Sequence, residues 1–123
     1  MDITPLIPEG RQIIQSYGAK GFKISGTEYE GPVIVTPFQT RIWKAASNII
    51  HLTAAHIENE RALMEEMDVI LLGTGKTSQF PPDEVYKAFP RAPEIMETGA
   101  ACRTYNVLVA EDRRVAAVLL NAQ

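Results

Sequence analysis

The sequence has few of the residues that usually hold metals or form disulfides. Its 123 residues include one cysteine, Cys102, so an intrachain disulfide cannot form, whereas small secreted domains usually carry several. The two histidines, His51 and His56, are five positions apart, which misses the i, i+4 spacing that places two metal ligands on one helix face. We therefore expect no bound metal and histidines that lie at the surface or cap a helix.

Long apolar runs and an excess of positive charge are also missing. The longest wholly apolar runs, such as Val69–Leu72 and Val115–Leu120, are far shorter than the roughly 20 residues of a membrane helix. The start, Met1–Arg11, does not show a basic region followed by an apolar one, so we expect a cytoplasmic protein. Because the net charge is −3 and there is no basic stripe, we do not expect nucleic-acid binding.

The composition is that of an ordinary globular protein. Apolar residues make up 46% of the chain and charged residues 22%, and a length of 123 residues suits one domain. We expect a single domain over residues 1–123, with an extended or disordered start at 1–9. A domain of this size buries roughly two thirds of the surface of its unfolded chain, which is enough for a hydrophobic core.

The first half of the sequence is rich in short β-strand patterns. Strands are predicted at Arg11–Tyr17, Phe22–Ser25, Pro32–Thr36 and Arg41–Lys44. Gly18–Gly21, between the first two strands, is typical of a hairpin connection, and Tyr29–Gly31 is expected to be a further turn. Strands joined by such short connections pair antiparallel.

The second half alternates helices with strands. The predicted helices are Thr53–Glu66, Pro81–Phe89 and Thr98–Asp112, and the predicted strands are Val69–Leu72, Glu94–Glu97 and Val115–Leu120. Thr53 and Thr98 are expected to be N-caps, and Ile57 and Met64 are expected to face the core. Because strand–helix–strand units connect parallel strands, the sequence predicts an α/β fold with a mixed, partly parallel sheet and helices packed against it.

The segment Leu72–Thr77, with the sequence LGTGKT, looks like part of a nucleotide-binding loop. A P-loop needs a glycine where Ile70 stands and a helix directly after the loop, but Ser78–Pro82 intervenes. The dinucleotide-binding pattern fails as well, because Ser78 occupies its third glycine position. We interpret the segment as a tight turn that needs glycine conformations, and we expect neither a nucleotide nor another cofactor.

Cys102 is predicted near the first turn of the helix that begins at Thr98. The positive end of a helix can lower the pKa of a thiol and make a cysteine reactive. A cysteine nucleophile also needs a base, and both histidines, His51 and His56, are far away in the sequence. We therefore expect a buried, structural cysteine, and a redox-responsive thiol is the alternative.

The strands that are predicted to end at Leu72 and near Glu97 define the candidate site. If these strands are parallel and share a sheet, their carboxyl ends open on one edge, where ligands gather in open α/β sheets. Loop amides and free helix N–H groups would there face a small anion or a carboxylate of a partner. The residues predicted to line this functional surface are Gly73, Thr74, Gly75, Thr98 and Arg103. In the alternative interpretation, Thr98 only caps its helix and the glycines only turn the chain.

Four segments occur in an order and at a spacing that resemble a known family: Leu71–Gly75, Glu94–Thr98, Ala101–Asn106 and Ala110–Ala117. The family is the domain of unknown function 498, which includes a mitochondrial assembly factor for respiratory complex I. The resemblance extends over most of the chain, and it implies a three-layer fold with a mixed central sheet. It implies no established reaction, cofactor or catalytic residue. Where the family usually has an aspartate before the capping threonine, this chain has Glu97.

The function expected from the resemblance is that of a non-enzymatic protein-binding or assembly factor. Its partner would be a protein, and the family implies a setting in respiratory or membrane-complex assembly. The alternative is a small enzyme or small-anion-binding protein that uses the Gly73–Gly75 edge. An enzyme should have a deep pocket with convergent polar groups, whereas a partner-binding domain should expose apolar surface.

Overall fold

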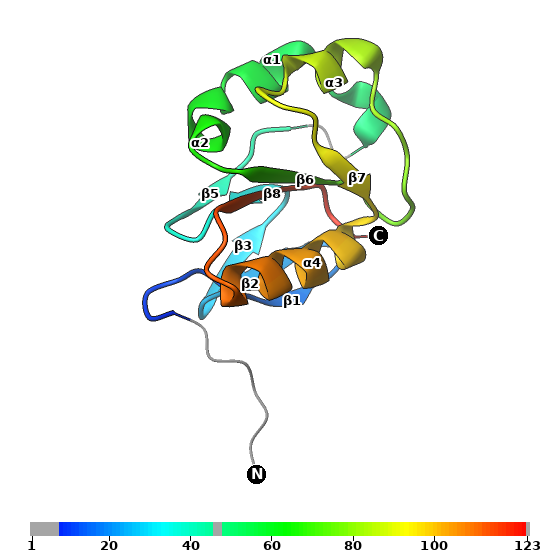
Figure 1. Cartoon of the computed structure of the whole chain (residues 1–123). Coiled ribbons are helices and arrows are strands. Elements are labelled where there is room, and N and C mark those ends of the chain that lie inside the picture. The colour runs from blue at the N-terminus through cyan, green and yellow to red at the C-terminus, as the bar shows by residue number, and fades with distance from the viewer. Residues whose placement is uncertain (1–7, 46–47, 123) are drawn as a thin grey trace.

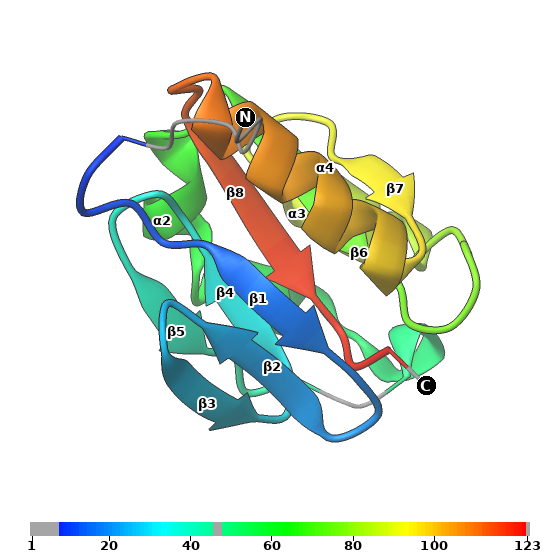
Figure 2. The same cartoon turned by 90° about the horizontal axis from the view of Figure 1, so that it is seen from below.

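Three layers make up the structure, a computed structural model that describes residues 8–45 and 48–122 (Figure 1). The upper layer in Figure 1 holds helices α1 (Ala54–Glu58), α2 (Arg61–Glu65) and α3 (Asp83–Ala88). A five-stranded sheet forms the middle layer, and helix α4 (Thr98–Ala110) lies beside a three-stranded sheet in the lower layer (Figures 1 and 2). The predicted three-layer α/β fold is confirmed. Of the start predicted at 1–9, residues 1–7 lie outside the described residues.

The middle sheet is mixed, as predicted. Its strands are β4 (Val33–Val35), β5 (Thr40–Ile42), β6 (Val69–Gly73), β7 (Glu94–Met96) and β8 (Val115–Leu119), in the order β5-β4-β8-β6-β7. β6 pairs parallel with β7 and β8, whereas β4 pairs antiparallel with β5 and β8. β8 is buried along its whole length because the outer layers cover both faces of the sheet.

The three-stranded sheet is an antiparallel meander of β1 (Ile14–Tyr17), β2 (Gly21–Ile24) and β3 (Thr27–Glu30). The predicted hairpin connection before Gly21 is confirmed, but the predicted turn at Tyr29–Gly31 is wrong for its first two residues, which belong to β3. The chain instead turns at Ser25 and Gly26, whose φ angles are both positive, as a tight hairpin turn requires. β1 is also shorter than predicted at its start.

The single helix predicted over residues 53–66 is two short helices, α1 and α2. Between them the hydrogen bonds change from the α-helical spacing of four residues to the 3₁₀ spacing of three. The Glu60 N–H donates to Ile57 O, three residues back. Asn59, a poor helix former, stands at the break. The expected core positions Ile57 and Met64 are both fully buried. His56 caps α1, which is one of the two roles expected for the histidines. Its Nδ1 accepts a hydrogen bond from Thr53 N at 2.9 Å.

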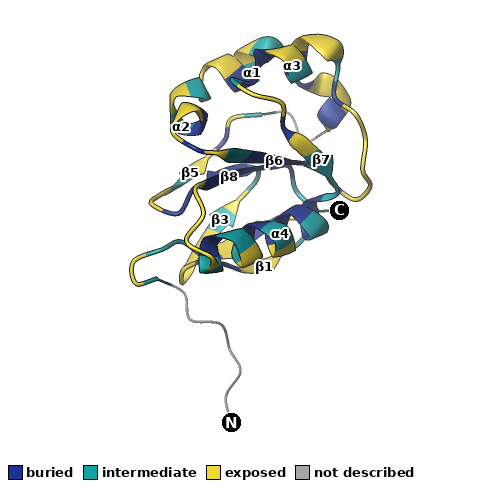
Figure 3. Cartoon of the chain, viewed as in Figure 1, coloured by how far each residue is buried: buried dark blue, intermediate teal, exposed yellow. Residues whose placement is uncertain are grey.

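Two hydrophobic cores lie on opposite faces of the middle sheet, and Figure 3 shows the buried residues gathered between the layers. The core under α1, α2 and α3 includes Trp43, whose Nε1 donates to His56 O at 3.0 Å. The opposite core joins α4 to the three-stranded sheet and includes Cys102, Tyr105 and Phe22. The middle sheet is therefore held from both sides, which fixes the positions of its strand ends.

Candidate functional site at the carboxyl edge of the sheet

The strand ends predicted to form the site do meet at one edge. β6 and β7 are parallel, and Gly73 is in register with Met96, so the loop after β6 and the start of α4 lie next to each other. Thr74 N donates to Met96 O, and Thr98 N donates to Gly75 O, both at 2.9 Å. We call this region the carboxyl edge; it lies at the right of Figures 1 and 2.

Thr98 occupies the interior of this edge and is not the N-cap of α4. The N-cap is Glu97, whose Oε1 accepts a hydrogen bond from Ala100 N at 2.9 Å. The hydroxyl of Thr98 is fully buried; it accepts from Gly75 N and donates to Leu120 O, each at 2.8 Å. The prediction that Thr98 caps the helix is wrong because its hydroxyl joins the loop to the end of β8 instead.

Gly73 allows α4 to approach the sheet closely. A Cβ at this position would lie 2.9 Å from Leu119 Cδ2 and 3.1 Å from the Cα of Thr98. Gly75 has a φ of 104°, a conformation that favours glycine. Close approach explains one glycine of the LGTGKT segment, and turning explains the other.

Thr74 closes the loop on itself. Its hydroxyl donates to Thr77 O at 2.6 Å and accepts from Gln79 N at 3.1 Å. The chain then continues without a helix until α3 begins at Asp83. The N–H groups of Thr74 and Gly75 are thus bonded within the protein, unlike those of a loop that cradles phosphate.

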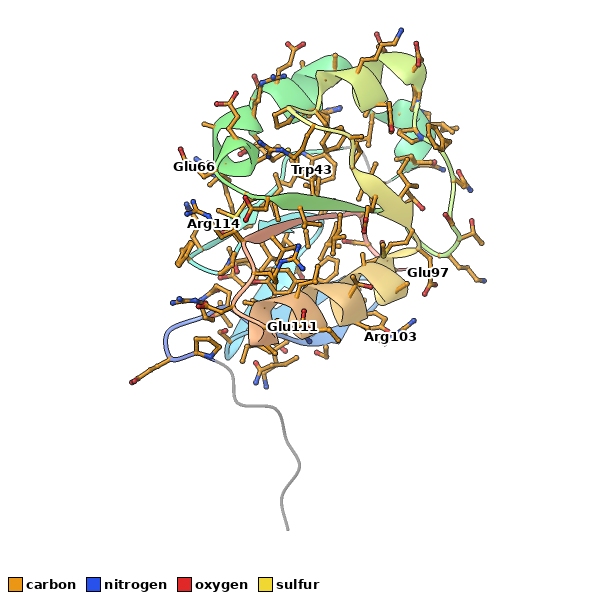
Figure 4. The ribbon with its side chains drawn as sticks, viewed as in Figure 1. Trp43, Glu66, Glu97, Arg103, Glu111 and Arg114 are labelled. Carbon is orange, nitrogen blue, oxygen red and sulfur yellow. The ribbon has the colours of Figure 1, made fainter. Side chains whose placement is uncertain are left out.

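Arg103 is the exposed member of the five predicted site residues, since the other four are buried. Its guanidinium donates to Tyr17 Oη at 2.7 Å and forms an ion pair with Glu97 Oε1 at 3.3 Å. Figure 4 shows Arg103 and Glu97 near the start of α4. The Tyr17 ring also covers Gly99, where a Cβ would lie 2.9 Å from the tyrosine hydroxyl. Tyr17 could not be predicted from the sequence because it is 86 residues away from Arg103. It also belongs to the three-stranded sheet, whereas the site strands β6 and β7 belong to the five-stranded one.

Cys102 is buried, as predicted, with 2% of its surface exposed. Burial raises the pKa of its thiol to about 12, and the nearby Arg103 charge lowers it by less than burial raises it. His51 and His56 belong to segments that pack on the opposite face of the middle sheet, so neither can serve Cys102 as a base. These features are those of a structural cysteine.

The rest of the recognised segment Ala101–Asn106 attaches β1 to α4. Tyr105 Oη donates to Gln12 O at 2.9 Å, and burial raises the pKa of this phenol. The Asn106 side chain bonds both backbone groups of Ile14, accepting from its N at 3.0 Å and donating to its O at 2.8 Å. Asn106 therefore replaces a neighbouring strand at the edge of β1, which holds the three-stranded sheet in place.

A small polar hollow lies at the carboxyl edge beside the loop. Its volume is about 260 Å³, below the roughly 300–1,000 Å³ of typical small-molecule sites. It is lined by Asn48, Thr74, Gly75, Lys76, Thr77, Gln79 and Asn121. Within the described part of the chain, no three or more His, Cys, Asp and Glu side chains gather so that they could hold a metal ion. The hollow thus offers one cationic side chain and amide groups.

Two residues that are close in sequence to the lining of this hollow, Phe80 and Ile50, have large exposed side chains. Phe80, at the end of the loop, is 71% exposed, and its ring contacts Tyr86 with the centroids 5.1 Å apart. Ile50 is 64% exposed and lies two residues after Asn48, which lines the hollow. Both side chains are available to contact another molecule.

Together the fold and the site define a three-layer α/β domain whose carboxyl edge is bonded internally at Gly73–Gly75 and continues into the exposed loop Lys76–Phe80. The chain belongs to the family described as Protein of unknown function (DUF498/DUF598), whose model matches residues 14–120. This confirms the family resemblance read from the sequence.

Among related proteins, the chain is 31% identical over 111 residues to NADH dehydrogenase [ubiquinone] 1 alpha subcomplex assembly factor 3 of Danio rerio; the match covers 88% of this chain and 63% of that protein. The chain thus spans about three fifths of the length of such assembly-factor relatives. It is 29% identical over 97 residues to the 13 kDa major membrane protein of Francisella tularensis, covering 76% of this chain and 77% of that protein.

Solved structures show the same fold. A protein described as an outer membrane protein from Bartonella henselae superposes with a TM-score of 0.76 at 32% identity, covering 96% of this chain and all of that one. A Mth938-like domain from Bordetella pertussis gives a TM-score of 0.76 at 22% identity, covering 98% of this chain and 92% of that one. Over residues 8–45 and 48–122, none of the helices has the length and apolar character needed to cross a membrane.

Proposed function

We propose that this chain is a non-enzymatic protein-binding domain that acts as an assembly factor, and that its carboxyl edge contacts the partner. The observation that carries the proposal is the exposed loop Lys76–Phe80, which ends in a largely exposed phenylalanine. Aromatic side chains that protrude from a rigid support are typical anchors of protein–protein contacts.

The predicted site residues supply the rigid support. Gly73, Thr74, Gly75 and Thr98 bond or pack the loop base against β7, β8 and α4, so in this proposal they position the surface from below. Arg103 supplies an exposed guanidinium on the same edge. A loop held at its base presents its side chains in one arrangement, which lowers the entropy cost of binding.

The names of the relatives support an assembly role, because several of them are complex I assembly factors. The proposed partner is accordingly a protein that is being built into a respiratory or other membrane-bound complex. We place this activity in the cytoplasm, where a free cysteine stays reduced.

The alternative of a small enzyme or anion-binding protein has less support. A phosphate or carboxylate would need free N–H groups at the loop and at the start of α4. Those of Thr74, Gly75, Thr98 and Ala100 already have acceptors within the protein. The hollow beside the loop is also small for a substrate site.

The test compares two exposed apolar positions. Phe80→Ser removes the proposed anchor, whereas Val107→Ser removes a side chain that is 58% exposed on the outer side of α4. Proteins that the wild type and the Val107 variant retain from the native extract should be lost with the Phe80 variant, and a photoreactive residue at position 80 should crosslink to them. Equal retention by all three proteins would contradict the proposal.

A further inference from the structure

His56 joins two segments of the layer above the middle sheet. Its Nδ1 accepts a hydrogen bond from Thr53 N at 2.9 Å, which closes the start of α1. Its backbone O accepts from the Nε1 of Trp43 at 3.0 Å, and Figure 4 shows Trp43 between the upper helices and the middle sheet. Thr53 directly follows the buried Leu52 and the 3₁₀ turn Ile49–His51. His56 therefore holds both the first turn of α1 and the end of the segment that leads into it.

The bond from Thr53 fixes the protonation state of the His56 ring. A backbone N–H group can only donate, so Nδ1 is unprotonated and the neutral ring carries its hydrogen on Nε2. In a protonated ring both nitrogens are donors, and the Nδ1–H would face the Thr53 N–H. The Thr53 hydroxyl, 3.4 Å from Nδ1, can accept this hydrogen only at the outer limit of hydrogen-bond distance, and Thr53 N still loses its acceptor. Because histidine side chains change charge between about pH 5 and 8, this cap depends on pH.

No described carboxylate forms an ion pair with His56, so a positive charge on its ring is not offset by a direct partner. Of the acids on α1 and the elements next to it, Glu58 and Glu84 are exposed, and exposed charges interact weakly through water. The other charged or basic groups of these elements are the ion pairs Arg41–Glu60, Arg61–Glu65 and Lys87–Asp83, together with Lys44 and His51.

We propose that His56 is a pH-sensitive clasp on the segment that runs from the polar hollow to α1. The neutral imidazole closes the start of α1, whereas the protonated ring releases Thr53 N and loosens the turn before it. That turn carries Ile50, which is 64% exposed, and it follows Asn48, which lines the hollow. The clasp is complete at slightly alkaline pH and is lost as the pH falls. The inference goes beyond the proposed partner contact, which involves neither His56 nor Thr53.

The test is amide hydrogen exchange of the full chain at about pH 8 and about pH 5.5, where carboxylates remain ionised. Each rate is compared with that of an unstructured peptide at the same pH, which gives a protection factor. The amides of Thr53 and of Asn59, which donates to Ala55 O at the end of α1, should lose protection about fivefold at the lower pH. Fivefold corresponds to the roughly 1 kcal/mol of a helix cap. Amides of α4, in the opposite layer, should keep their protection; no fall in α1, or an equal fall in α4, would overturn the proposal.

Two glutamine variants separate His56 from the second histidine of the chain. His56→Gln keeps an acceptor at the third position of the helix, as in a common capping box, but cannot be protonated, so its protection factors should be equal at both pH values. His51→Gln is the matched control: it removes the exposed histidine of the preceding turn and should respond to pH like the wild type. A response that persists in the His56 variant, or that disappears in the His51 variant, would contradict the clasp.

Discussion

Replacing Thr98 with valine would remove the hydrogen-bond link at the base of the carboxyl edge while keeping its shape. The valine leaves Gly75 N and Leu120 O, both bonded to the threonine hydroxyl at 2.8 Å, without that partner. Each buried group left unsatisfied costs about 1–3 kcal/mol, so the free energy of unfolding should fall by about 2–5 kcal/mol. Domains of this size have roughly 5–15 kcal/mol in total, so the variant should still fold.

Thr98→Ser is the matched control, because it keeps the hydroxyl and loses one methyl group. Its expected cost is about 1 kcal/mol. Urea unfolding followed by the fluorescence of Trp43, the single tryptophan, measures both values. For 123 residues the valine variant should also melt about 8–20 °C lower than the wild type. If valine costs no more than serine, the hydroxyl does not hold the loop and the argument fails.

Two further changes test close packing and burial. Gly73→Ala should lower the free energy of unfolding by about 1–3 kcal/mol because its Cβ would press on the α4 backbone. Gly18→Ala, with open space around it, should lower it by less than about 0.5 kcal/mol. Similar urea midpoints for the two variants would contradict this expectation. Burial raises the pKa of the Cys102 thiol to about 12, so above pH ~8.5 the unfolded chain binds fewer protons than the native one. The free energy of unfolding should therefore fall as the pH rises, by at most about 1.4 kcal/mol per pH unit. Urea titrations between pH 8 and 9.5 should show a shallower fall for Cys102→Ala, and an unchanged fall would refute the burial argument.

The layers and strand directions could be predicted from the sequence because they depend on local patterns. The continuous apolar runs at Val69–Leu72 and Val115–Leu120 are typical of strands covered on both faces, and both became central strands. The alternation of strands with helices then predicted the parallel pairing of β6 with β7 and β8. These features required no knowledge of which distant side chains meet.

The errors arose where a tertiary contact decided the local structure. The sequence favoured Thr98 as the N-cap of the helix, but a carbonyl 22 residues away, at Leu120, takes the threonine hydroxyl, and Glu97 is the cap instead. The contact of Tyr17 with Gly99 and Arg103 likewise joins strand β1 to helix α4, two elements that the sequence does not place relative to each other. The segment Leu72–Thr77 was interpreted as a tight turn, but its internal hydrogen bonds depend on Thr74 reaching Thr77 and Gln79 further along the chain.

The segments that identify the family build the scaffold, and this bears on where the proposed partner would be recognised. Leu71–Gly75 and Glu94–Thr98 form the strand ends and the internal link at Thr98, and Ala101–Asn106 attaches β1 to α4. The exposed loop Lys76–Phe80 lies between these segments and outside all of them. Because affinity for a partner depends on exposed anchors whereas the fold depends on buried contacts, the proposed function predicts that a change of partner requires changes in that loop rather than in the buried positions of the recognised segments.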